Sequence, residues 1–162
     1  MNDGLTNSRK LQQFLDDEVV LMRSLDQLLM EEQAVLTDNE AEKLGTITPE
    51  KNNVLMQIIE LEKNRNLFLT SVGYTPDAKG MQDFFSAPTN DAKIEETWKL
   101  LLSISSEAQE KNRTNGLLIS RQLSRNQSAL NVLQQNNQTG SMYGADGQSK
   151  NSPSAGRGIV AG

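Results

Sequence analysis

The chain has 162 residues and a net charge of −5, from 21 acidic and 16 basic side chains. It contains no cysteine and no histidine, which excludes disulfides, zinc sites built on thiolate or imidazole ligands, and nucleophile–histidine dyads. Aromatic residues make up only 4% of the chain, so long amphipathic helices are favoured over a globule with a large core.

Charge is distributed unevenly along the chain. Residues 1–62 carry 13 acidic and 5 basic side chains, residues 63–110 carry 7 and 5, and residues 111–162 carry 1 and 6. The C-terminal third therefore has a net charge of +5 and favours an acidic partner surface. Nucleic acid is not expected as that partner, because the protein as a whole is acidic and these basic residues have no aromatic neighbours on which bases could stack.

The N-terminal stretch does not have the pattern of a secretion signal. Asp16, Asp17 and Glu18 interrupt its apolar residues, whereas a signal needs an unbroken apolar segment. The longest apolar runs, such as Val19–Met22, are far shorter than the roughly 20 residues that span a membrane. We therefore expect a soluble, cytoplasmic protein with no membrane insertion.

The first predicted helix covers residues 8–44, with Asn7 or Ser8 as its N-cap. Apolar residues recur there at gaps of three and four, which is the helical period. These positions are Leu11, Phe14, Leu15, Leu21, Met22, Leu25, Leu28, Leu29, Val35 and Leu36. A helix of this length spans about 55 Å and needs an antiparallel partner to bury its apolar stripe.

The sequence LGTITPEK predicts the break between the first two helices. Gly45 is suited to a C-cap, Thr48 to an N-cap and Pro49 to the first helical position. The second helix is accordingly predicted over residues 49–72, with an apolar stripe that includes Val54, Leu55, Ile58, Leu61, Phe68 and Leu69. A connection this short favours antiparallel packing of the two helices.

A long loop is predicted from Val72 to Asn90, because glycine and proline punctuate it. One short turn is expected around Met81–Phe85. Tyr74, Phe84 and Phe85 are expected to fix this loop onto the end of the hairpin.

The third predicted helix covers residues 91–135. Its first half carries a full apolar stripe, whereas its second half is rich in Asn, Gln and Ser. Asn115-Gly116 is interpreted as a weak point within one long helix, with a break there as the alternative.

These patterns predict an all-α fold, a long antiparallel helical hairpin plus a third long helix in a coiled-coil-like bundle, over residues 1–136. Residues 137–162 have no periodicity and are expected to form a disordered C-terminal tail.

No constellation of residues indicates catalysis. Carboxylate pairs such as Glu31/Glu32 and Glu60/Glu62 fit solvated helix faces, because a di-metal site on a helical bundle also needs histidines. The chain lacks the glycine-rich motifs GxxxxGK[ST] and GxGxxG that bind nucleotide phosphates. We therefore expect no metal, no cofactor and no enzymatic activity.

An apolar strip in the second half of the third helix is the strongest candidate for a binding site. Leu118, Ile119, Leu123, Leu130 and Leu133 form it. Burying each such side chain contributes roughly 1.5–3 kcal/mol, so three or four together could support a helix-in-groove complex. The alternative is that the strip packs on the first helix or on another copy of the chain.

Several segments, taken in order, resemble the flagellar export chaperones of the FlgN type. They are LDQLLMEEQAVLTDNEAEKLGTITPEKNNVLMQIIELEKNR, VGY, KNRTNGLLI and YGADGQ. Each is weak by itself, but their order and spacing extend over nearly the whole chain. Pro49 departs from the family pattern and is expected only to sharpen the turn.

This resemblance implies a chaperone of type III flagellar export that binds the amphipathic C-terminal helices of the junction proteins FlgK and FlgL. It implies cargo contact in the C-terminal part of the chain, at Leu118, Ile119, Gln122, Leu123, Asn126, Leu130 and Leu133. It also implies docking of Tyr143 to the cytoplasmic domain of the export gate protein FlhA. Without the resemblance, Tyr143 is interpreted as a tail residue without a role or one that contacts the protein's own helices.

Two alternatives stay open beside this function. The chain is either a structural coiled-coil homo-oligomer or the chaperone of another export cargo, such as the filament cap. Weak homo-oligomerisation is also compatible with the export chaperone.

Overall fold

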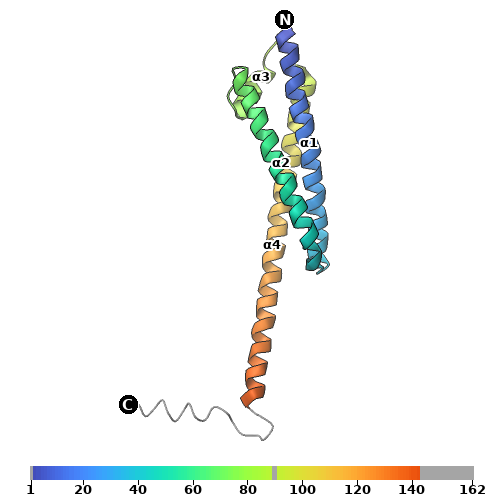
Figure 1. Ribbon diagram of the computed structural model, residues 1–162, viewed down its shortest axis with the longest axis vertical. Helices are drawn as coiled ribbons and strands as arrows, with labels where there is room; N and C mark the ends of the chain where they lie inside the picture. The colour runs from blue at the N-terminus through green and yellow to red at the C-terminus, as the bar shows by residue number, and fades with distance from the viewer. Residues whose placement is uncertain (1, 89–90, 143–162) are drawn as a thin grey trace, which may run out of the picture. The chain divides into compact units, whose positions relative to one another are not determined.

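The computed structural model describes residues 2–88 and 91–142, and side chains within residues 3–88 and 91–137 (Figure 1). This part of the chain contains four α-helices and one short 3-10 helix, which confirms the predicted all-α fold. They are α1 (Asn2–Thr37), η1 (Ala41–Lys43), α2 (Leu44–Ser71), α3 (Ala78–Phe85) and α4 (Ala92–Met142). The chain divides into two units, Met1–Leu118 and Ile119–Gly162, which are described separately.

In the first unit, α1 and α2 form the predicted antiparallel hairpin (Figure 1). Two ion pairs give its register. Arg65 Nη1 lies 2.6 Å from Glu18 Oε2, and Lys51 Nζ lies 2.8 Å from Glu32 Oε2. Moving 14 residues forward along α1 therefore moves 14 residues back along α2, as expected for two regularly packed helices.

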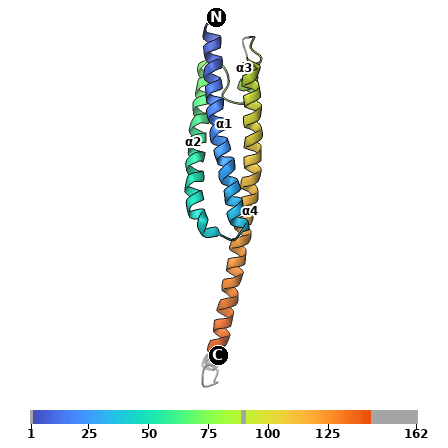
Figure 2. The ribbon, with the colours of Figure 1, turned by 90° about the vertical axis from the view of Figure 1, so that its right-hand side faces the viewer.

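The first half of α4 runs parallel to α1 (Figure 2). It also meets α2, since Arg65 lies on the Trp98 ring and Ile58 and Ala108 share a core cluster. Three hydrogen bonds at nearly constant sequence separation give the register of α4 against α1. Gln12 Nε2 donates to Thr97 Oγ1 at 85 residues' separation, Lys111 Nζ donates to Asp26 Oδ1 at 85, and Asn115 Nδ2 donates to the Leu29 carbonyl at 86. The predicted hairpin plus third helix is thus observed.

Apolar side chains on α1 form the centre of the core. The larger cluster gathers near the N-terminal end of α1 and consists of Leu11, Leu15, Val19, Phe68, Leu69, Met81, Phe84, Phe85, Ile94, Leu101 and Ile104. A second cluster of Leu25, Leu29, Ile58 and Ala108 continues it toward the hairpin turn. Most of these residues lie on the predicted apolar stripes, because a stripe at the helical period can only be buried against another helix.

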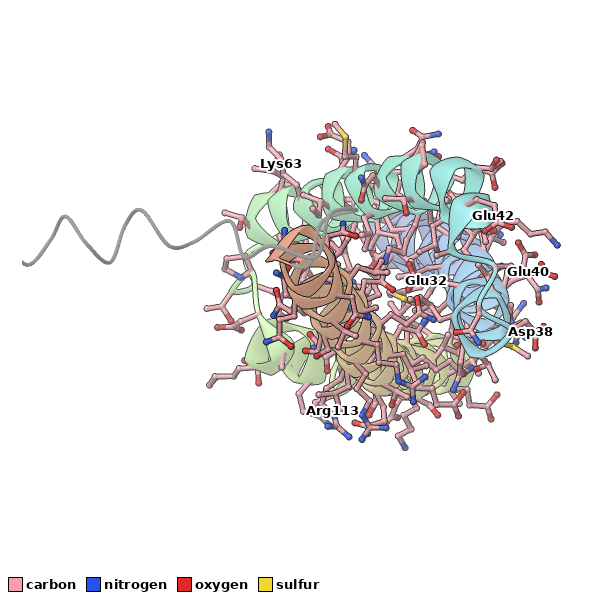
Figure 3. All side chains as sticks on the ribbon, turned by 90° about the horizontal axis from the view of Figure 1, so that it is seen from below. Glu32, Asp38, Glu40, Glu42, Lys63 and Arg113 are labelled. Carbon is pink, nitrogen blue, oxygen red and sulfur yellow. The ribbon has the colours of Figure 1, made fainter. Side chains whose placement is uncertain are left out.

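Two groups of buried polar side chains interrupt this core. Glu18 and Arg65 are buried at 4% and 7% exposure, and the Arg65 guanidinium lies 4.9 Å from the centre of the Trp98 ring. Glu32 accepts hydrogen bonds from Lys51 and from Asn115. Figure 3 shows Glu32 inside the bundle and Lys63 and Arg113 at its outer surface. Each group links α1, α2 and α4, so it couples the registers of all three helices.

The predicted boundary between the first two helices is wrong. The prediction ends the first helix at residue 44 and begins the second at Pro49, whereas α1 ends at Thr37 and α2 begins at Leu44. Asn39 adopts a left-handed φ of 58°, and the Glu40 amide donates to the Val35 carbonyl at 3.0 Å. This is the Schellman arrangement that ends many helices, with asparagine replacing the more common glycine.

Pro49 consequently lies inside α2 rather than at its start. The ring removes the hydrogen bond to the Gly45 carbonyl and costs about 3 kcal/mol or more in a helix interior. Burial of Ile47, which contributes roughly 1.5–3 kcal/mol, offsets most of this cost. Gly45 is not a C-cap, because it lies in the first turn of α2.

The predicted short turn in the loop after α2 is the helix α3. Asp77 caps it by accepting a hydrogen bond from the Gly80 amide at 2.8 Å. Tyr74 and Phe84 meet edge to face at 5.3 Å between ring centres, and Phe85 is buried. The expectation that these aromatic residues fix the loop onto the hairpin is confirmed.

The helix α4 is continuous through Asn115 and Gly116 and extends to Met142, seven residues beyond the predicted end. The alternative of a break at Asn115-Gly116 is therefore wrong. Residues 143–162 lie outside the described residues, and the division at residue 136 between a helical domain and a tail stays a prediction. Among the described helices, none combines the length and the apolarity needed to cross a membrane.

Candidate functional site

The predicted strip lies mainly in the second unit, on α4. Ile119, Leu123, Asn126, Leu130 and Leu133 occupy one face of the helix, because their spacings of four and three follow its period. Leu123, Leu130 and Leu133 are 63%, 53% and 58% exposed. Three large apolar side chains on one helical face are therefore open to solvent.

The remaining predicted contact residues are less uniform in exposure. Asn126 is exposed, whereas Ile119 and Gln122 are partly buried. Leu118 is also partly buried and belongs to the first unit. The exposed part of the strip accordingly runs from Leu123 to Leu133.

One further exposed apolar residue in this unit was not predicted. Val132 is 54% exposed, but it lies on the side of α4 opposite to Leu123 because nine residues make two and a half turns. It shares that side with Arg121 and Arg125, the only charged residues between positions 119 and 137. The strip and its flanks are therefore uncharged.

The first unit contains a separate apolar groove that the sequence analysis did not identify. It has a volume of about 510 Å³, its floor is Met22, Leu25 and Leu29 of α1, and its walls come from α2 and α4. Leu55 and Leu102 lie on opposite walls and are 37% and 49% exposed. Leu55 lies on a predicted apolar stripe, but it and Leu102 stay accessible because they face each other across this groove.

Glu18 and Asp77 of the first unit are engaged in structural contacts. Burial raises the pKa of Glu18 to about 7, against the opposing effect of Arg65. Hydrogen bonds from Thr75 and Gly80 lower the pKa of Asp77, the cap of α3. Neither carboxylate lines the groove, whose ionisable lining residues are Lys51 and Glu62.

Tyr143, the predicted contact of the export gate, lies outside the described residues.

Comparison with known proteins gives consistent matches over almost the whole chain. The family model described as FlgN protein matches residues 1–151. The flagella synthesis protein FlgN of Proteus mirabilis is 31% identical over 152 residues, covering 93% of this chain and 97% of that protein. The proteins of the same name from Salmonella typhimurium and Yersinia enterocolitica are 29% and 28% identical, and each covers 93% of this chain. No solved structure gives a significant match.

Proposed function

The chain belongs to the FlgN family of flagella synthesis proteins, and from this we propose that it is an export chaperone of the bacterial flagellum. Its cargo would be the amphipathic C-terminal helices of the hook–filament junction proteins FlgK and FlgL. It would act in the cytoplasm by stoichiometric binding, without turnover or cofactor, and prevent these helices from associating prematurely.

The observation that carries this proposal is the exposed strip on α4. Leu123, Leu130 and Leu133 present more than half of their surface to solvent on one helical face. An amphipathic cargo helix would cover them in the manner of helix-in-groove recognition. The wider contact would include Leu118, Ile119, Gln122 and Asn126.

The proposal predicts that changing Leu123 and Leu130 together to alanine weakens cargo binding by about a hundredfold. Each leucine would lose most of an apolar contact of roughly 1.5–3 kcal/mol, and about 1.4 kcal/mol is a factor of ten. Isothermal titration calorimetry with the C-terminal helical segment of FlgK measures the effect. Helix content and melting temperature should be unchanged, because both residues are exposed and alanine favours helix.

Leu102→Ala is the matched control for this variant. Leu102 is a comparably exposed leucine of α4 but lines the groove of the first unit, so its loss should leave cargo binding unchanged. If Leu102→Ala abolishes binding and the double variant does not, the groove is the cargo site instead. If the unaltered protein binds neither FlgK nor FlgL, the export-chaperone proposal for these two cargoes fails. The filament cap as cargo, or a structural homo-oligomer, would then be the better hypothesis.

We further propose that Tyr143 docks the loaded chaperone to the cytoplasmic domain of FlhA. A tyrosine offers a large contact area at low entropic cost, which suits an anchor near a chain end. Tyr143→Ala should lower binding to that domain by about tenfold or more and leave calorimetric titration with FlgK unchanged. Tyr143→Phe tests whether the hydroxyl group contributes. Equal FlhA binding by all three proteins would contradict this role.

A further inference from the structure

Four of the strip residues, together with Asn126 between them, follow a heptad pattern on one face of α4. The spacings from Ile119 to Leu123, Asn126, Leu130 and Leu133 are four, three, four and three residues. Alternation of three and four is the signature of a seam that packs against one other helix in a coiled coil. Four of the five seam positions are apolar, and the central one is the exposed Asn126, whose amide has no hydrogen bond to another described residue.

The positions that flank the seam carry no charge. They are Ser120, Gln127 and Gln134 on one side and Gln122, Ala129 and Asn136 on the other. Coiled coils commonly select partners through charged residues at these flanking positions. Selection at this strip therefore depends on the seam itself, where Asn126 is the one polar residue.

The same helix already uses an asparagine in this way inside the fold. Asn115 is 1% exposed, and its Nδ2 donates to the Leu29 carbonyl and to Glu32 Oε1, both at 2.9 Å. A register shifted by one turn would separate this amide from Glu32, and a lost hydrogen bond to a charged group inside the fold costs about 1–3 kcal/mol. Asn115 Oδ1 itself is buried without a hydrogen-bond partner among the described residues. Asn115 thus shows how a seam asparagine on α4 penalises the wrong alignment against a neighbouring helix.

We propose that Asn126 determines the specificity and register of cargo binding. The partner is a helix with heptad-spaced apolar residues and one hydrogen-bonding side chain, such as Asn, Gln, Ser or Thr, facing Asn126. This inference rests on the proposed function for the identity of the partner as cargo. Pairing of two copies strip to strip is disfavoured as the occupant, because residues 119–137 carry two basic and no acidic side chains in each copy and would repel one another.

The test compares full-length protein with Asn126→Leu and with Asn131→Leu. Asn131 is exposed on the same helix but lies outside the seam, so it controls for added apolar surface. Calorimetry measures binding of two probes, the C-terminal helical segment of FlgK and a synthetic helical peptide with leucine at every core position. Asn126→Leu should bind the leucine peptide about tenfold more tightly and lose its preference for the FlgK segment.

The outcomes separate this inference from the proposed function. Suppose that Leu123→Ala and Leu130→Ala abolish binding, but that Asn126→Leu has the same ratio of affinities for the two probes as the unaltered protein. This result would leave the proposed function standing and overturn the role of Asn126. Equal changes in Asn126→Leu and Asn131→Leu would overturn it too. Self-association of Asn126→Leu but not of Asn131→Leu in sedimentation velocity would support it. Failure of the unaltered chain to bind the FlgK segment would overturn both.

Discussion

Replacing Arg65 with methionine is expected to lower the free energy of unfolding by about 3–5 kcal/mol at pH 8. The substitution removes the cation from an ion pair whose members are 4% and 7% exposed. It also removes the contact of the guanidinium with the Trp98 ring. Glu18 must then either stay a buried anion without a counter-charge or take up a proton at pH 8, and both outcomes cost folding free energy. Urea unfolding followed by circular dichroism measures the change.

A double variant distinguishes loss of the pair from loss of packing. Glu18→Leu combined with Arg65→Met replaces both charges with apolar side chains of similar volume, a change that is often neutral or stabilising in buried ion pairs. Glu18 Oε1 and Arg65 Nε are buried without a hydrogen-bond partner among the described residues, so the pair is incompletely satisfied. Recovery of stability is therefore expected. A double variant as unstable as Arg65→Met would show that the guanidinium acts mainly through packing on Trp98.

The sequence was sufficient for the fold because helical periodicity is a local signal. Leu11, Leu15 and Leu29 lie on predicted stripes and are almost completely buried, since a long apolar stripe has to be covered. The same reasoning predicts the end of the first helix at residue 44, whereas α1 ends at Thr37. Gly45 and Pro49 are strong helix breakers when judged from sequence alone. In the fold, however, Asn39 adopts a left-handed conformation that ends α1, and Ile47 of α2 is buried. Both features depend on how the hairpin closes.

Side-chain contacts between different helices could not be predicted from the sequence. Glu18 appeared only as an interruption of an apolar run, because its partner Arg65 lies 47 residues away. Asn115 is predicted only as part of a weak point within one long helix, yet it is one of the most buried residues. The exposed strip was predictable in outline for the opposite reason. Its leucines keep the helical period while the residues around them become polar, and that contrast is visible without a partner.

Stability is expected to fall as the pH rises from about 5 to about 7.5, and Glu18 is expected to cause most of this change. Burial raises the pKa of Glu18 in the folded protein from 4.5 to about 7. Between these two values the folded state holds a proton that the unfolded state has released, so raising the pH favours unfolding. The full effect is about 3 kcal/mol. The chain has no histidine, so no other side chain with an ordinary pKa titrates in this range.

Glu18→Gln should remove most of this pH dependence, because glutamine stays neutral at every pH. Glu60→Gln, an exposed position on α2, should keep it and serves as the control. Unfolding free energies at pH 5.5, 6.5 and 7.5 measure the slope for each protein. Arg65→Met gives an internal check, since without the cation the pKa of Glu18 rises further and the slope becomes steeper. A flat profile in the unaltered protein would mean that Arg65 outweighs burial and holds Glu18 ionised throughout.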